Sequence, residues 1–196
     1  TFYEPIGMHR TLYNPLEQFE ITEITPTEDD KTFRQRLVHG YVHDPGAAML
    51  GGVSGHAGLF SCATDLAHLA QMLLNGGEYG GMRFIDSVTI REFTKRSSLI
   101  SRRGIGWDKP AVNKDKSNPC ADEASPATFG HTGFTGTAIW MDPKYDLTFI
   151  FLSNRVYPDA TNWKIVNKNI RPRIQQIIYQ AVDPSLMPSD STEAGS

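Results

Sequence analysis

The sequence predicts an α+β fold in which an antiparallel sheet is packed by a C-terminal helix. Two runs rich in β-forming residues, 137–141 and 147–152, flank a five-residue turn, which is typical of a β-hairpin. Leucine and alanine recur at helical spacing over 66–74, and isoleucines share one helical face within 162–182. Helices separated from a hairpin, rather than alternating with single strands, indicate the α+β class.

The first third of the chain has no long periodic stretch. Residues 20–32 are acidic and polar, and we expect a surface loop there. The block 39–61 holds six glycines, which predicts a backbone that turns tightly or approaches another group closely.

Two helices are expected in the middle of the chain. Ser61 or Thr64 can cap the helix over 66–74, and a second, short helix runs from its N-cap Asp86 to Lys95. Residues 102–107 have the pattern of a short strand.

The second half of the chain opens with a polar, proline-rich segment over 109–126, which is expected on the surface. The predicted hairpin follows, and then the helix 162–182. Pro172 either kinks this helix or marks its true first turn. We therefore expect one domain over 1–182 and a disordered tail over 183–196.

Composition excludes several classes of protein. A chain of 196 residues can bury a core without disulfides, and its net charge of −3 argues against nucleic-acid binding. No apolar run reaches the roughly 18 residues of a membrane span. Cys62 and Cys120 leave the redox compartment open. The chain starts without Met or a signal peptide, so we expect a fragment of a longer protein or a processed product.

The stretch before the hairpin, His131-Thr132-Gly133-Phe134, carries the most chemistry. His131 can move a proton near neutral pH, and the hydroxyl of Thr132 can bind a carboxylate. Gly133 leaves room for a substrate backbone, and the amide of Phe134 can point at a developing oxyanion. From these residues alone, a glycine-rich turn with a solvent-facing histidine is the alternative.

This stretch, within FGHTGFTGTAIWMDP, resembles the Lys/His-Thr/Ser-Gly motif of the serine β-lactamase and penicillin-binding-protein superfamily. Three further segments resemble that family in the same order: FYEPIGMHRT at 2–11, GLFSCATDLA at 58–67 and FLSNR at 151–155. The chain is most similar to the C-terminal portion of a class C-like serine hydrolase domain. It resembles the version fused behind a glycoside hydrolase family 3 domain in some envelope proteins.

The resemblance implies a β-lactamase/transpeptidase-like fold and cleavage of an amide or ester through an acyl-serine intermediate, with no metal or organic cofactor. His131 and Thr132 would be catalytic, and Gly133, Phe134 and Asp159 would bind substrate. The family's nucleophile motif, Ser-x-x-Lys, and its Tyr-x-Asn motif do not occur in this chain. We therefore expect the nucleophile to lie upstream and the chain alone to be inactive.

Some residues depart from the family pattern or allow another interpretation. His131 stands where Lys is frequent, which favours carboxypeptidase, aminopeptidase or esterase chemistry over β-lactamase activity. Asp159 would repel a carboxylate-bearing substrate, and a solvated loop aspartate is the alternative. His39 and His43 have zinc-ligand spacing, but the glycines and proline around them favour a structural role. His56 is expected to order the loop near the cleft.

Two other functions remain open from the sequence. One is a catalytically inactive binding or scaffolding module of an envelope glycosidase. The other is a glycan-binding accessory domain. The resemblance implies a periplasmic or cell-envelope location and a small-molecule or peptide substrate. It also implies a sheet edge that the missing N-terminal part of the domain, or self-association, would cover.

Overall fold

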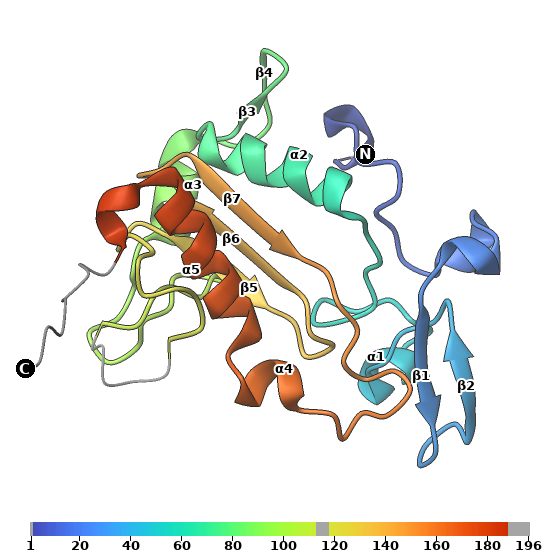
Figure 1. The fold of residues 1–196 in the computed structure, drawn as a ribbon. Helices are drawn as coiled ribbons and strands as arrows, with labels where there is room; N and C mark the ends of the chain where they lie inside the picture. Colours follow the sequence, from blue (N-terminus) through green and yellow to red (C-terminus); the bar gives the residue numbers. More distant parts are fainter. Residues whose placement is uncertain (1, 113–117, 188–196) are drawn as a thin grey trace, which may run out of the picture.

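The computed structural model describes residues 2–112 and 118–187, which are arranged around a three-stranded antiparallel sheet (Figure 1). Its strands are β5 (Phe129–Thr132), β6 (Ala138–Asp142) and β7 (Leu147–Phe151), in the order β5-β6-β7. The predicted hairpin is β6–β7, and its register pairs Trp140 with Phe149. The α+β class predicted from the sequence is confirmed.

Alternation along β6 builds a core on each face of the sheet. Met141 packs with residues of α2 (Ala63–Leu74) and α3 (Ser87–Thr94) on one face. Trp140 is buried on the other face, together with Cys120, and Ile178 of the C-terminal helix packs there. Because strand side chains point alternately to the two faces, one β-strand serves both cores.

The two middle helices form where the sequence predicts them, but the predicted cap by Ser61 or Thr64 is wrong, because the N-cap of α2 is Cys62 and no side chain caps it. Asp86 caps α3 by accepting a hydrogen bond from the Val88 amide at 2.7 Å. Asp65, in the first turn of α2, is buried and accepts hydrogen bonds from the Arg10 amide (2.7 Å) and the Thr11 hydroxyl (2.8 Å). This carboxylate fastens the N-terminal segment to the start of α2.

The single helix expected over 162–182 is wrong. The chain forms α4 (Lys164–Asn167) and α5 (Ile170–Val182), separated by Asn169, whose φ of 49° is left-handed and ends the first helix. Pro172 lies in the first turn of α5, where its missing N–H leaves no hydrogen bond unmade. A 3-10 turn, Pro184–Leu186, lies within the tail predicted to be disordered over 183–196, and residues 188–196 of that tail lie outside the described residues.

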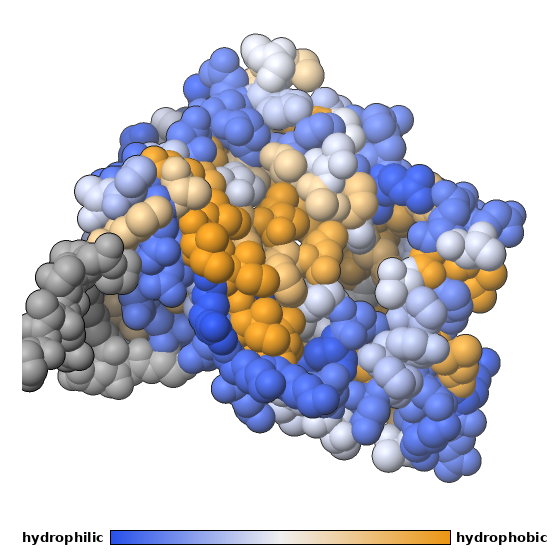
Figure 2. Space-filling view, viewed as in Figure 1, coloured by the Kyte–Doolittle hydropathy of each residue, from blue (hydrophilic) through white to orange (hydrophobic). Residues whose placement is uncertain are grey.

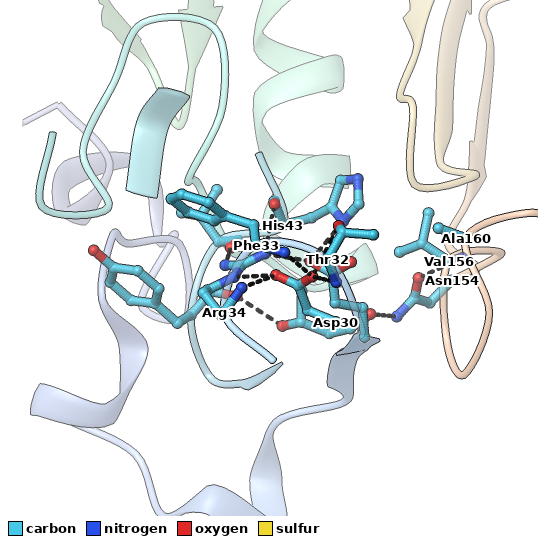
Figure 3. A network of polar contacts seen from close by, with 12 residues as sticks. Asp30, Thr32, Phe33, Arg34, His43, Asn154, Val156 and Ala160 are labelled. Carbon is cyan, nitrogen blue, oxygen red and sulfur yellow. Dashed lines mark hydrogen bonds and ion pairs between the residues drawn. The ribbon is translucent and has the colours of Figure 1, made fainter. Parts of the chain in front are cut away.

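The surface loop expected over 20–32 is also wrong. Pro26–Asp30 forms β1, which pairs antiparallel with β2 (Arg36–His39). Glu28 and Asp30 are buried because Arg34, in the connecting turn, forms ion pairs with both. Figure 3 shows Arg34 beside Asp30. The acidic composition of this segment suggested exposure to solvent, whereas ion pairing with Arg34 allows its carboxylates to be buried.

Residues 102–107 do not form the predicted strand; only Asp108 bridges to Gly130, at the outer edge of β5. The glycine-rich block contains a short helix, α1 (Pro45–Met49), capped by the Asp44 carboxylate. Among the described residues, no helix combines the length and apolar character that crossing a bilayer requires. The remaining short elements are β3 (Glu78–Tyr79), β4 (Met82–Arg83) and the 3-10 turns Glu4–Ile6, Pro15–Glu17 and Ile21–Glu23.

Apolar side chains gather over α5 and the adjoining β7 on the face seen in Figure 2. Ile177 of α5 is 65% exposed, and Leu152, directly after β7, is 43% exposed. In the part of the chain that the structure describes, no strand pairs with the outer edge of β7.

Candidate active site

The outer edge of β5 is hydrogen-bonded to another segment at one position, and the end of the strand beyond that position is not. Gly130 and Asp108 exchange two backbone hydrogen bonds of 2.8 and 3.0 Å. Because backbone groups alternate in direction along a strand, the Thr132 N–H points to the same edge as Gly130. The bridge to Asp108 ends before Thr132, so this edge is accessible at the end of the strand.

The side chains of His131 and Thr132 point to opposite faces of the sheet. Phe129 packs with the α2 side of the sheet, and His131, two residues later, shares that face. Thr132 is opposite Ala138, which packs on the α5 side. His131 and Thr132 are predicted to act together, but their side chains lie on opposite faces of the sheet. They share only the backbone at the end of β5.

Two hydrogen bonds fix the ring of His131. Its Nδ1 lies 2.8 Å from the Thr132 carbonyl oxygen, and its Nε2 lies 3.0 Å from Nη1 of Arg103. A guanidinium only donates, so Nε2 carries the lone pair and Nδ1–H donates to the carbonyl. The two contacts thus orient the ring so that Nε2, the nitrogen that accepts, faces Arg103.

A buried carboxylate positions the segment that carries Arg103. Asp108 accepts hydrogen bonds from Nε and Nη2 of Arg102 at 2.6 and 2.8 Å, and Arg103 lies 3.7 Å away. Burial pushes the pKa of Asp108 upward, but the Arg102 hydrogen bonds outweigh it, and the pKa lies below its usual value. The carboxylate stays ionised and holds both arginines beside β5.

The turn after β5 is tightly constrained. The Gly133 amide donates to the Thr137 carbonyl at 2.8 Å, and the Gly136 amide donates to the Gly133 carbonyl at 3.1 Å. Gly136 has a φ of 114°, and a Cβ there would lie 2.7 Å from Oγ of Ser153. Glycine is required because the turn packs directly on the segment that follows β7.

Phe134 is the exposed tip of this turn, and its ring lies between three side chains. It stacks on His43 with 5.3 Å between centroids and meets Trp163 edge-on at 5.8 Å. The Arg155 guanidinium lies 4.3 Å from its centroid, and Nε of Arg155 donates to the Phe134 carbonyl at 2.8 Å. The Phe134 N–H donates no hydrogen bond within residues 2–112 and 118–187, so it is available to a ligand.

A pocket of about 340 Å³ opens beside the turn, on the α5 side. It brings together three of the five predicted site residues, Thr132, Gly133 and Phe134, but not His131 or Asp159. Its other lining residues are Arg155, Trp163, Val166 and Arg171.

Asp159 lies in the exposed loop after β7, and its carboxylate is occupied locally. Oδ1 accepts hydrogen bonds from the Thr161 amide and hydroxyl, both at 2.8 Å. These bonds lower the pKa of Asp159. The geometry matches the solvated loop aspartate that the sequence left as the alternative.

The sequence did not assign His43, Arg155, Trp163 or Arg171 to this site: Arg155 was noted only as part of the FLSNR segment, and His43 only for its spacing from His39. His43 reaches the site because the β1–β2 hairpin docks there: Nδ2 of Asn154 donates to the carbonyls of Pro26 and Thr27 at 2.7 and 2.8 Å (Figure 3). Arg155 and Trp163 come from the segment after β7. No local signal marks these contacts, because they depend on how distant segments pack.

The histidines of the glycine-rich block turn to different partners. His39 Nε2 lies 2.5 Å from the Ile24 carbonyl oxygen, whereas His43 Nδ1 lies 2.9 Å from a Glu28 oxygen. No cluster of three metal-ligating side chains occurs in the described parts of the chain. His56 bridges Ser54 and Asp44, at 2.8 Å to each, and so ties its loop to the N-cap of α1. Cys62 and Cys120 are free thiols.

Comparisons with known proteins agree with this architecture. The Beta-lactamase family model matches residues 1–168. Proteins of Salmonella gallinarum and Salmonella typhi, whose inferred names read D-alanyl-D-alanine carboxypeptidase, are 39% identical over 182 residues. These matches cover 87% of this chain and 42% of each relative, so the chain spans about two fifths of their length.

The crystal structure of a beta-lactamase from Mycobacterium bovis has the same fold. It superposes with a TM-score of 0.56 at 20% identity, covering 91% of this chain and 53% of that one. The family match spans most of the chain, and the β5 strip, its turn and the following hairpin lie within it. The chain belongs to the Beta-lactamase family.

Proposed function

We propose that this chain forms the non-nucleophilic wall of an acyl-transfer site, whose serine comes from a segment outside these 196 residues. The observation that supports it most is the constrained strip His131–Phe134 at an open strand edge, in a chain of this family. The strip offers a fixed basic nitrogen, a hydroxyl and free amides. An acylating serine enzyme needs these beside its nucleophile.

Each group of the strip has a separate role in the proposal. His131 presents the lone pair of Nε2 and moves a proton when Arg103 yields to substrate. The free amide of Phe134 donates to the oxyanion of the tetrahedral intermediate. The Thr132 backbone and hydroxyl align the substrate along the strand edge, and Gly133 leaves space for it.

The substrate class follows from the relatives. Their inferred names indicate peptides ending in D-alanyl-D-alanine. Because His131 stands in place of Lys, we include esters and other small acyl compounds in the proposed substrate class. A cell-envelope location follows from such a substrate.

The test uses the complete gene product and compares H131Q with H9Q. His9 is an exposed histidine, so its substitution is a matched control. We expect H131Q to lower kcat/KM for a D-alanyl-D-alanine peptide or an activated ester by about 100-fold or more, and H9Q to leave it unchanged. Equal activity of the two variants would overturn the role of His131.

The second candidate is an inactive binding or scaffolding module of an envelope glycosidase. The absence of Ser-x-x-Lys from these 196 residues favours it. Reading the encoded upstream segment decides between the two: a Ser-x-x-Lys motif supports the hydrolase, and its loss supports the module. An upstream glycoside hydrolase family 3 domain would support the proposed fusion.

The outer edge of β7 and the apolar side chains of α5 are where the remainder of the domain would pack. Light scattering of this chain alone tests that proposal. A well-behaved monomer with no self-association would count against it.

A further inference from the structure

The loop over 97–103, between α3 and β5, presents two adjacent apolar side chains to solvent. Leu99 and Ile100 are 105% and 100% exposed, more than any other large apolar side chain in the part of the chain that the structure describes. Single apolar residues that are partly exposed are common on protein surfaces, whereas two neighbours that contact nothing are not. Their side chains contribute nothing to the core, so the fold itself gives no reason for them.

Hydrogen bonds hold the loop in shape below its apolar tip. The Ser97 amide and hydroxyl both donate to the Arg103 carbonyl at 3.2 Å and close the base of the loop. Oγ of Ser98 accepts from the amides of Ile100 and Ser101 at 3.2 and 3.3 Å. The serines therefore serve the loop's own backbone, and Leu99 and Ile100 are held outward.

The surface around this tip is basic. Residues 91–108 contain five arginines and lysines but only two acidic residues, although the whole chain has a net charge of −3. Both acidic residues, Glu92 and Asp108, already pair with cations of the same segment, which leaves it with surplus positive charge. Arg96, directly before the loop, is exposed and forms no ion pair within residues 2–112 and 118–187.

The size and charge of this feature distinguish between possible partners. A stable protein interface covers about 800 Å² on each side, and two side chains on a narrow, serine-flanked loop provide far less. A lipid bilayer, by contrast, takes up a few apolar side chains at shallow depth and attracts cations beside them to anionic headgroups. We propose that the 97–103 loop docks on an anionic lipid surface, with Leu99 and Ile100 inserted among the acyl chains and Arg96 at the level of the headgroups.

The base of the loop also contacts the proposed catalytic strip. Nη1 of Arg103 lies 3.0 Å from Nε2 of His131. A docked loop would therefore bring the open end of β5 to the lipid surface. This consequence rests on the proposed function, whereas lipid binding does not. Lipid binding is measured without turnover, so the two proposals can fail separately.

The test measures binding of the complete gene product to vesicles of phosphatidylglycerol mixed with phosphatidylcholine, and to vesicles of phosphatidylcholine alone. L99S should bind the anionic vesicles about tenfold more weakly than the wild type, because one inserted apolar side chain is lost. L37S is the matched control: Leu37 is exposed on β2, opposite an acidic residue, and its loss should leave binding unchanged.

A second pair of variants tests the charge. R96Q should weaken binding to the anionic vesicles about fivefold at low salt, and added salt should remove this difference. R36Q removes an exposed arginine from β2 and should have no effect. Equal binding of the wild type to the two kinds of vesicle would contradict the role of charge.

Insertion is read at the loop itself, because other segments of the complete gene product can also bind lipid. Anionic vesicles should shift the tryptophan emission of L99W to shorter wavelength relative to the wild type, and should leave that of L37W unshifted. Equal vesicle binding by L99S and L37S, or no additional shift in L99W, would overturn the proposal. The absence of that shift is also the result expected if a protein segment, rather than lipid, covers the loop.

Discussion

The ring of His43 lies flat against the ring of Phe134, with 5.3 Å between their centroids and 14° between their planes. His43 follows the β1–β2 hairpin, and Phe134 is the tip of the turn after β5. This stacking joins a hairpin near the N-terminus to the strip in which the chemistry is proposed. Interactions that hold the hairpin therefore also hold the site.

Arg34 is the centre of the hairpin's stability. It forms ion pairs with Glu28 and Asp30 and donates to the carbonyls of Val42 (2.5 Å) and His43 (2.8 Å). Replacing Arg34 with Leu removes the guanidinium from two buried carboxylates, so we expect a loss of about 3–5 kcal/mol in the free energy of unfolding. Urea denaturation measures it. R36L is the control on the exposed side of β2, and a similar loss in both variants would contradict this account.

The lowered pKa of Asp30 makes the stability of the protein depend on pH in acid. The Arg34 side chain and the amides of Phe33 and Arg34 hold its pKa well below the usual range. A lowered folded-state pKa stabilises the protein above the unfolded value of about 3.9, and this stabilisation is lost as pH falls further. Unfolding free energies measured from pH 7 into acid should therefore fall less steeply in D30N than in the wild type. D29N, on the same strand but beside a surface lysine, should keep the wild-type slope.

Tyr179 of α5 reaches through the core to a buried carboxylate. Its hydroxyl donates to Oδ2 of Asp142 at 2.7 Å, while Ser125 donates to the same carboxylate through its amide (2.9 Å) and hydroxyl (2.6 Å). Because the lost bond is buried and charged, Y179F should lower the free energy of unfolding by about 1.5–3 kcal/mol. Y145F removes only an exposed contact with Lys144, and its effect should be much smaller in the same denaturation experiment.

Gly136 sets the shape of the turn that carries Phe134. G136A introduces a Cβ at a φ of 114°, 2.7 Å from Oγ of Ser153, so the turn or the segment after β7 must shift. G51A is the matched control: its φ of 77° is also positive, but no atom lies within 4 Å of the added Cβ. Left-handed backbone alone costs about 1–2 kcal/mol, and G136A should exceed G51A in loss of thermal stability. Equal losses would show that the contact with Ser153 is unimportant.

The sequence predicts those parts of the fold that depend on local pattern. The β6–β7 hairpin, α2 and the Asp86 cap follow from periodicity and turn residues, and all three are confirmed. The β1–β2 hairpin does not follow from such local signals, because its burial depends on Arg34 forming ion pairs with two acidic residues. Asn169 breaks the last helix through a backbone conformation that its residue type permits but does not require.

The candidate site likewise has a part that the sequence predicts and a part that depends on tertiary packing. Thr132, Gly133 and Phe134 are contiguous, so a motif identifies them, and the structure lines one pocket with them. Arg155, Arg171 and His43 arrive from three separate segments, and only tertiary packing brings them to Phe134. Alternation along β5 also separates the side chains of His131 and Thr132, which the motif alone presents as neighbours.

Covalent labelling of the complete gene product by an activated acyl ester, read by peptide mass spectrometry, tests the central claim most directly. The account predicts one acylated serine, located outside these 196 residues, whose labelling rate falls by about 100-fold in H131Q and is unchanged in H9Q. An acyl group on a serine of this chain, or labelling that H131Q leaves at the wild-type rate, would contradict it.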